Sequence, residues 1–269
     1  MDIKMEMILN RNEVYTRIID EVKRAGRIIV EAHNNQETIF DKEGFANFVT
    51  KYDKQVQNYL VGRFREILPE ASYLAEEEGL QQSMEKGFCF IIDPIDGTTN
   101  FIHEYMHSCI SVGLSYDGEM VMGVVYNPYR DEIFTAIKGQ GAYKNGEKIE
   151  AGTRPLEESI VAFGCARYNS EDTDQAFALA KGLYVKSRGL RNRGSSTLDI
   201  CDVACGRNGI YFELMLQPWD YAAASLILEE AGGCITQIDG QAITLDRPCS
   251  ILAGSEQCYK EAMDIIRIL

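Results

Sequence analysis

The spacing of hydrophobic positions changes twice along the 269 residues of the chain, and each spacing indicates a different kind of element. Near the N-terminus they recur every three to four residues, which predicts an amphipathic helix over residues 6–34. A second helical pattern follows Asp53 and ends at Pro69, so Asp53 is expected at the N-cap or in the first turn. Residues 39–50 between the two helices have mixed character and are expected to be extended or looped.

From residue 71 the hydrophobic spacing falls to two, which is typical of half-buried strands. The predicted strands cover residues 72–75, 88–92, 108–116, 119–126 and 132–137. Asp117-Gly118 joins two of them and is a strong signal for a two-residue hairpin. Gly139, Gly141 and Asn145-Gly146 mark further turns. We therefore expect an antiparallel meander in the middle of the chain.

After residue 155, strands and helices alternate. Strands are expected at residues 159–164, 210–214, 234–238 and 250–253, and helices at 172–183, 195–205, 218–231 and 256–269. Pro218 opens the third of these helices and Gly232 follows its end, which is the usual asymmetry of helix ends. The join between the halves, about 1–150 and 151–269, is short, so we expect them to pack closely as one domain over residues 1–269.

Composition excludes several classes of protein. The net charge of −14 argues against a direct nucleic-acid binder, which needs a basic face for phosphates. No apolar run approaches the roughly 20 residues of a membrane span. The N-terminal residues lack the pattern of a signal peptide, so a cytoplasmic location is expected. The eight cysteines include no C-x-x-C pair, which favours reduced, buried thiols.

The stretch from Phe90 to Phe101 carries the clearest chemical signal, with the sequence F-I-I-D-P-I-D-G-T-T-N-F. An apolar strand leads into Asp93 and Asp96, and Pro94 between them cannot donate to a sheet. The next residues, Gly97 and Thr98, are expected to present backbone N–H groups to an anion at a helix start. Carboxylates beside an anion site suit a phosphate bridged by Mg²⁺.

Further carboxylates stand at the ends of other predicted elements, at Asp53, Glu76, Glu77 and Asp220. One such residue alone is more often a helix cap or a solvated end. Together with the two aspartates of residues 90–101, they form a candidate cage for two or three hard cations.

Four motifs in order along the chain resemble those of the inositol monophosphatase family. D-P-I-D-G-T-T-N-F at 93–101 resembles its first signature, and W-D-Y-A-A-A at 219–224 with E-E-A-G-G at 229–233 resembles its second. V-T-K-Y-D at 49–53 resembles the V-T-x-x-D element, and A-E-E at 75–77 resembles G-E-E with Ala75 replacing glycine. The resemblance implies an α/β fold of the sugar and inositol phosphatase type, a layered α-β-α-β-α sandwich. The periodicity agrees, with an antiparallel half followed by an alternating half.

The resemblance also implies roles for individual residues. The metal ligands would be Glu76, Asp93, Asp96, Asp220 and the carbonyl of Ile95, holding two or three Mg²⁺ ions. Besides the ligand Glu76, the catalytic residues would be Asp53 and Thr98, which orient and deprotonate the attacking water. Substrate contacts would come from Lys42, Asp96, Gly97, Thr98, Gly194, Ser195, Ser196 and Glu213, with Glu213 accepting from a ring hydroxyl.

The implied function is a Mg²⁺-dependent phosphomonoesterase acting on inositol monophosphate or a similar polyol phosphate through metal-activated water. Fructose 1,6-bisphosphate, a phosphoadenosine nucleotide or NADP are alternative substrates. A cluster of basic residues consists of Lys186, Arg188, Arg191 and Arg193. It is either a solvated edge of the protein or a site that binds a second substrate phosphate or a partner. A different class is a protein-binding regulator that keeps the fold, as some bacterial relatives act with the transcription machinery. A homodimer and inhibition by lithium are also expected from the family.

The string H-E-Y-M-H at residues 103–107 matches the H-E-x-x-H motif of zinc metalloproteases. That motif needs both histidines on one helix face. Here it follows a phosphate loop and leads into a β-rich stretch, so we expect loop or cap histidines instead of a zinc site.

Overall fold

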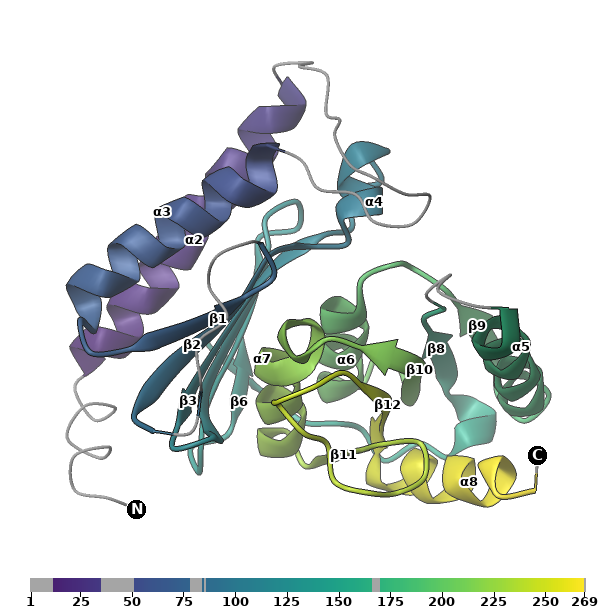
Figure 1. Ribbon diagram of the computed structural model, residues 1–269. Helices are drawn as coiled ribbons and strands as arrows, with labels where there is room; N and C mark the ends of the chain where they lie inside the picture. The colour runs from purple at the N-terminus through teal and green to yellow at the C-terminus, as the bar shows by residue number, and fades with distance from the viewer. Residues whose placement is uncertain (1–11, 35–50, 78–83, 85, 166–169, 269) are drawn as a thin grey trace.

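The computed structural model describes residues 12–34, 51–77, 84, 86–165 and 170–268. Its elements form five layers, in the order helix pair, sheet, helix pair, sheet and helix pair (Figure 1). Three apolar cores fill the spaces between these layers. The layered α/β sandwich predicted from the sequence is therefore confirmed.

The first layer consists of α2 (Asn12–Asn34) and α3 (Lys51–Ile67), which pack against each other and against the first sheet. The apolar residues of α2 that recur at helical spacing are fully buried, namely Ile18, Val22, Ala25 and Ile29. Phe64 of α3 stacks on Phe90 of the sheet with ring centroids 4.4 Å apart. The predicted start of the first helix, at residue 6, lies outside the described residues.

The first sheet has seven strands in chain order, and all neighbours are antiparallel except β1 and β2. The strands are β1 (Ser72–Ala75), β2 (Phe88–Asp96), β3 (Cys109–Tyr116), β4 (Glu119–Asn127), β5 (Glu132–Ile137), β6 (Ala142–Lys144) and β7 (Glu147–Ile149). Asp117 and Gly118 join β3 to β4 with φ angles of 50° and 81°, as a tight hairpin requires. The predicted meander and hairpin are confirmed.

Two details of this sheet differ from the prediction. Strands β6 and β7 lie where only turns were expected, because three-residue strands are too short to show an alternating pattern. Strand β2 continues through Pro94 to Asp96, although it was expected to end at residue 92. Its pairing with β3 shifts between Asp93 and Asp96, and this irregularity accommodates the proline, which cannot donate to a ladder.

The middle layer contains α6 (Ser196–Ala204) and α7 (Pro218–Glu230), between the two sheets (Figure 1). Helix α7 approaches the first sheet very closely at Gly123. A Cβ atom at that position would lie 2.4 Å from the carbonyl oxygen of Ala223, so only glycine fits there. This contact fixes α7, and with it Asp220 in its first turn, against the first sheet.

The second sheet has the order β11-β12-β10-β8-β9. Its strands are β8 (Ile160–Phe163), β9 (Gly189–Arg191), β10 (Ile210–Leu216), β11 (Gly233–Thr236) and β12 (Cys249–Ser255), and α5 (Ser170–Tyr184) and α8 (Glu256–Ile266) cover its outer face. Strand β9 was not predicted, again because it is only three residues long. A short 3₁₀ helix (Leu156–Glu158) precedes β8.

Two further findings bear on the sequence predictions. All eight cysteines are free thiols. Within the described part of the chain, no helix is both long enough and apolar enough to cross a membrane.

Candidate active site

Four carboxylates converge where β1, β2 and α7 meet. Strands β1 and β2 are parallel, with Ala75 opposite Ile92, so the residues that follow this pair, Glu76 and Asp93, end side by side. The backbone N–H of Glu76 donates to the carbonyl of Ile92 at 3.2 Å, which continues the ladder to this point. Asp96 ends β2, and the fourth carboxylate, Asp220, lies in the first turn of α7.

These carboxylates raise one another's pKa values. Burial, and then the neighbouring carboxylates, raise the pKa of Asp93 and of Asp220 well above the usual range. Burial and the charge of Asp53 raise the pKa of Glu76 to about 7, although a hydrogen bond with Asp93 partly offsets them. Burial also raises the pKa of Asp96, against the hydrogen bonds that it accepts. Buried like charges of this kind are costly until protons or cations neutralise them.

The donor chemistry of this acid cluster, meaning Glu76, Asp93, Asp96 and Asp220, suits a hard divalent cation. All its side-chain donors are carboxylate oxygens, and the Ile95 carbonyl lies between two of them in the sequence. In the described ranges, no group of three or more His, Cys, Asp and Glu side chains already forms a metal-binding arrangement. The fit therefore rests on oxygen donors and on buried negative charge, and not on a preformed coordination geometry.

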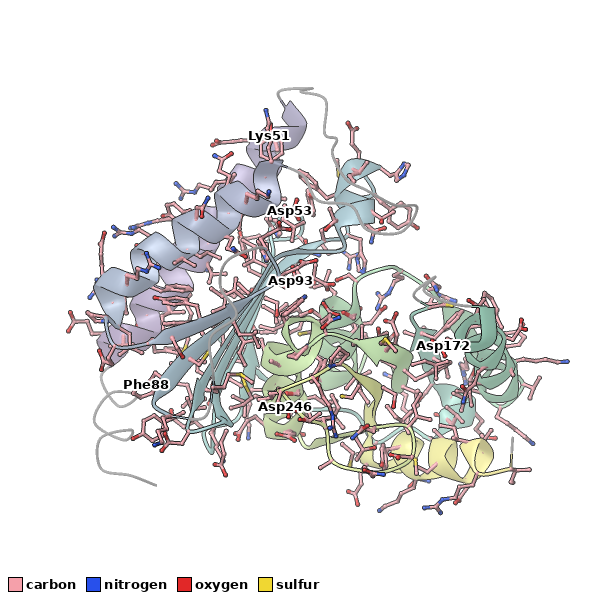
Figure 2. All side chains as sticks on the ribbon, in the orientation of Figure 1. Lys51, Asp53, Phe88, Asp93, Asp172 and Asp246 are labelled. Carbon is pink, nitrogen blue, oxygen red and sulfur yellow. The ribbon has the colours of Figure 1, made fainter. Side chains whose placement is uncertain are left out.

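The predicted pair that handles the water is close together in space, 45 positions apart in the chain. The Thr98 hydroxyl is 3.3 Å from Oδ1 of Asp53 and 3.0 Å from the carbonyl oxygen of Ile95, and it donates to either. Asp53 is fully buried in the first turn of α3. Thr98 begins α4 (Thr98–Ile102), directly after Gly97 with φ of 86°. Figure 2 shows Asp53 and Asp93 at the same end of the first sheet.

A polar cavity of about 270 Å³ adjoins two members of the acid cluster. Its lining comprises Asp96, Thr99, Gly164, Cys165, Asn192, Gly194, Ser195, Ser196, Asp199, Tyr211, Glu213, Met215, Leu216 and Asp220. The structure thus brings Gly194, Ser195, Ser196 and Glu213, all predicted substrate residues, to one cavity. A larger cavity of about 370 Å³, lined by residues 148 and 150–153 among others, includes none of the predicted site residues, and we assign it no catalytic role.

The start of α6 connects this cavity to the acid cluster. The Ser195 hydroxyl donates to Oδ2 of Asp96 at 2.5 Å, and the backbone N–H of Thr197 donates to the same oxygen at 3.0 Å. Ser195 also accepts from the backbone N–H of Leu198 at 3.4 Å and so caps α6, at the point where the sequence predicted that this helix begins. The Thr197 hydroxyl donates to the carbonyl of Asp220 at 2.8 Å. One short segment therefore orients both aspartates.

Asn100 is a positioning residue that the sequence did not indicate. Its side-chain amide is 2.6 Å from the carbonyl oxygen of Arg193, 2.8 Å from that of His107 and 3.2 Å from that of Gly194. A Cβ on Gly97 would lie 3.0 Å from the Gly194 carbonyl, so the two loops touch. No local pattern indicates the contacts of Asn100 with residues 193 and 194, because these residues lie more than ninety positions away in the sequence.

The predicted basic cluster divides into two parts. Arg193 is partly buried and pairs with Asp199 through Nε at 2.8 Å and with Asp202 at 2.6 Å. Its guanidinium therefore holds the loop before α6 to that helix. The other three members are exposed, namely Lys186, Arg188 and Arg191.

The other predicted features lie outside the described residues or near the end of α4. Lys42 and the first two residues of the V-T-x-x-D element lie outside the described residues. His103 is the C-cap of α4 and the following residues form a loop, so the two histidines do not share a helix, as predicted. His107 is buried, and burial together with the nearby arginines lowers its pKa to about 4.

Tyr211, Gly164 and Asp199 also line the cavity but were missed from the sequence. An i, i+2 relation to Glu213 on a strand could have indicated Tyr211. Gly164 and Asp199 reach the cavity through tertiary contacts that no local signal announces.

Comparison with known proteins places this fold and site in a family. The sequence model of the inositol monophosphatase family matches residues 10–267. The chain is 34% identical over 241 residues to an inositol-1-monophosphatase of Bacillus subtilis, covering 89% of this chain and 91% of that protein. It is also 34% identical over 246 residues to a putative Nus factor SuhB of Neisseria meningitidis, covering 91% of this chain and 94% of that protein.

The fold is also similar to that of a solved structure. The second inositol monophosphatase of Staphylococcus aureus, with inositol monophosphate bound, superimposes with a TM-score of 0.80 at 28% identity. The match covers 94% of this chain and 92% of that one. A layered α/β sandwich with buried carboxylates beside a polar cavity defines a phosphatase of the type that is generally metal-dependent. The chain belongs to the inositol monophosphatase family.

Proposed function

We propose that this phosphatase is a Mg²⁺-dependent phosphomonoesterase that hydrolyses inositol monophosphate or a similar polyol phosphate. The observation that carries the proposal is the cavity shared by Asp96, Asp220 and Glu213. It joins candidate cation ligands to a carboxylate that can accept from a substrate hydroxyl. Two or three Mg²⁺ ions would be held by Glu76, Asp93, Asp96, Asp220 and the Ile95 carbonyl.

Bound Mg²⁺ would neutralise charge on the phosphate and make a bound water more acidic. The protein's own contribution is orientation and proton transfer. The hydroxyl of Thr98 lies beside Asp53, so it can fix the position of a water while Asp53 accepts the proton. The backbone N–H groups of Gly97 and Thr98 would hold phosphate oxygens. Lys42, which lies outside the described residues, is proposed as a further substrate contact. The water oxygen forms the new bond to phosphorus while the bond between phosphorus and the polyol oxygen breaks on the opposite side, and that oxygen takes up a proton from solvent water.

The substrate assignment rests on the cavity. Its volume of about 270 Å³ lies just below the usual range of ligand sites and suits a small ligand such as a single ring. Its lining combines the hydroxyls of Ser195 and Ser196 with the carboxylate of Glu213, and these groups suit a ligand with several hydroxyls. The relative crystallised with inositol monophosphate supports the same assignment, and the structure of that relative with 2'-AMP bound is the reason to include nucleotides among the substrates tested.

The test is phosphate release with and without Mg²⁺ from inositol 1-phosphate, fructose 1,6-bisphosphate, phosphoadenosine phosphate and NADP. We expect the highest kcat/KM with inositol 1-phosphate and loss of activity when Mg²⁺ is chelated. Higher kcat/KM with one of the other three would transfer the assignment to that substrate. Undiminished activity in a chelator would contradict the metal-dependent mechanism. Lithium is expected to inhibit the reaction.

A second candidate function is protein binding, alone or beside catalysis, and the similarity to a putative Nus factor favours it. A pull-down from cell extract with the wild type and with Asp220→Asn separates the two functions. Equal capture of one partner by both proteins would show binding independent of catalysis, whereas capture of none would count against this candidate. A homodimer, also proposed from the family, is checked by light scattering of the purified protein.

A further inference from the structure

Strand β10 presents two polar side chains to the middle layer. Residues 211 and 213 lie two apart on the strand, so Tyr211 and Glu213 point to the same face. Tyr211 belongs to the core around α6 and α7, whereas Phe212 between them faces the outer core under α5 and α8. Both polar side chains border the cavity.

The two side chains are joined directly. The Tyr211 hydroxyl donates to Oε2 of Glu213 at 2.6 Å, a short charge-assisted hydrogen bond. Tyr211 is 1% exposed and Glu213 is 8% exposed, so little water competes for the contact. Burial raises the pKa of Tyr211 well above its ordinary value, which keeps the hydroxyl protonated and able to donate. The contact fixes the rotation of the carboxylate about its side-chain bonds.

The Glu213 carboxylate fits in its place only because residue 164 is a glycine. Strands β8 and β10 are parallel, with Phe163 opposite Phe212, so Gly164 passes beside Glu213. The backbone N–H of Gly164 donates to the carbonyl of Phe212 at 3.0 Å and holds it there. A Cβ at position 164 would lie 2.0 Å from Oε2 of Glu213 and 2.4 Å from its carboxyl carbon. Any other residue would displace the carboxylate.

We propose that Tyr211 and Gly164 are positioning residues that hold the Glu213 carboxylate toward the cavity as an acceptor for a substrate hydroxyl. Through that carboxylate, they select phosphate esters of polyols over esters without hydroxyl groups. The inference rests on the proposed phosphatase function and adds the two residues that set its selectivity. Tyr211 supplies the fixed hydrogen bond, and Gly164 supplies the space.

The experiment compares kcat and KM for inositol 1-phosphate and for 4-nitrophenyl phosphate, which has no hydroxyl to recognise. We expect Tyr211→Phe to raise KM for inositol 1-phosphate about tenfold, the value of one well-placed charged hydrogen bond. KM for 4-nitrophenyl phosphate should change less than about twofold. In a Glu213→Gln background, Tyr211→Phe should add almost nothing, because the two residues act through one contact.

Tyr59→Phe is the matched control. Tyr59 also donates to a glutamate at 2.6 Å, Oε2 of Glu21, but it lies on α3 in the outer helix layer. This variant should leave the selectivity between the two esters unchanged. A loss of selectivity equal to that of Tyr211→Phe would overturn the proposal, because it would show a general effect of losing a tyrosine hydroxyl that donates to a glutamate.

Gly164→Ala tests the same carboxylate without removing a hydroxyl and keeps the inference testable should Tyr211→Phe fold poorly. Circular dichroism melting identifies folded variants, and folded Gly164→Ala should again raise KM for inositol 1-phosphate alone. Equal KM changes for both esters, no change in either, or full additivity with Glu213→Gln would overturn the positioning role. A wild type inactive on both esters would instead overturn the proposed phosphatase function.

Discussion

At the scale of single residues, the Thr98 hydroxyl has one proton and two acceptors within reach. It is 3.0 Å from the Ile95 carbonyl and 3.3 Å from Oδ1 of Asp53. A donation to Ile95 leaves the hydroxyl's lone pairs able to accept from a water that Asp53 deprotonates. The proposed mechanism therefore depends on the hydroxyl and not on the methyl group of this side chain.

Thr98→Val is expected to lower kcat by about 10²-fold or more, because it removes the group that orients the water. Thr98→Ser retains the hydroxyl and should keep kcat within about tenfold of the wild type. Steady-state phosphate release measures both. A Val variant as active as the Ser variant would remove Thr98 from the mechanism.

Motifs identify residues whose roles follow from their neighbours in the sequence. They miss residues whose partners lie far away along the chain. Glu76 follows β1, Asp93 lies near the end of β2 and Asp220 lies in the first turn of α7, so a local pattern is enough to find them. The roles of Asn100 and Gly164 depend on partners 93 and 49 positions away, and no periodicity links such positions. Sequence reasoning could therefore predict the acids, but not the residues that hold the surrounding loops.

At the scale of elements, Asn100 of α4 ties the loop that follows this helix to the loop before α6. Its amide faces three carbonyl oxygens, so an acceptor in its place would repel all three. We expect Asn100→Asp to lower kcat/KM at least tenfold for every phosphate ester, because small displacements of reacting groups are costly. Asn58→Asp makes the same chemical change on the exposed surface of α3 and should have no effect. Equal activity of the two variants would contradict a positioning role for Asn100.

Helices α2 and α3 are linked by a buried carboxylate, Glu21. Burial acts to raise its pKa, but hydrogen bonds from Tyr59 and Arg63, with the charge of Arg24, outweigh it, and the net pKa lies below the ordinary value. A lowered pKa in the folded state stabilises the fold above the unfolded-state pKa, near 4.5. That stability is lost as the pH falls below it.

Glu21→Gln is therefore expected to reduce the free energy of unfolding by about 1 kcal/mol at pH 7. The difference from the wild type should shrink below about pH 4, where Glu21 becomes protonated in both states. Thermal melts at pH 7 and pH 4 measure the difference at each pH. Glu66→Gln, which alters the exposed pair with Arg63, serves as a control with little effect at either pH. A Glu21→Gln deficit that does not depend on pH would contradict the electrostatic origin.

Element lengths explain which parts of the fold were predictable. The long helices α2 and α3 span enough residues to show a clear period. Helix α7 is buried on most sides, so Pro218 at its start and Gly232 after its end indicated it instead, and Asp117-Gly118 indicated β3 and β4. Strands β6, β7 and β9 have three residues each, which is too few to show a period. They are recognised as strands only by their pairing with neighbouring strands in the sheet. Strand β2 can continue through Pro94 because its register with β3 shifts there. The sequence of β2 alone does not indicate such a shift.

At the scale of the whole molecule, the chain carries a net charge of −14 and concentrates four acids in one cluster, in which Asp93 and Asp96 are buried and Glu76 and Asp220 are partly exposed. A cation bound there would remove repulsion that the folded state otherwise bears. Mg²⁺ should therefore bind the folded protein and not the unfolded chain, and so stabilise it.

At a Mg²⁺ concentration one hundred times its Kd, we expect about 2.7 kcal/mol of added stability and a clear rise in Tm. Asp220→Asn should abolish most of that rise, although the amide oxygen can still accept the hydrogen bond from Gln217 and keep the helix cap. Calorimetric melts with Mg²⁺ and with chelator measure both. The same rise in Tm in both proteins would place the cation elsewhere.

The close contact between Gly123 and Ala223 has a consequence for changing the enzyme by design. It holds α7 and Asp220 against the first sheet, whereas β8 and β10, which border the proposed substrate cavity, belong to the second sheet. Residues at positions 164, 192 and 211 can then be varied in a library without moving the groups proposed to perform hydrolysis. Selection on new phosphate esters from such a library should yield variants that change in preference while keeping their metal requirement.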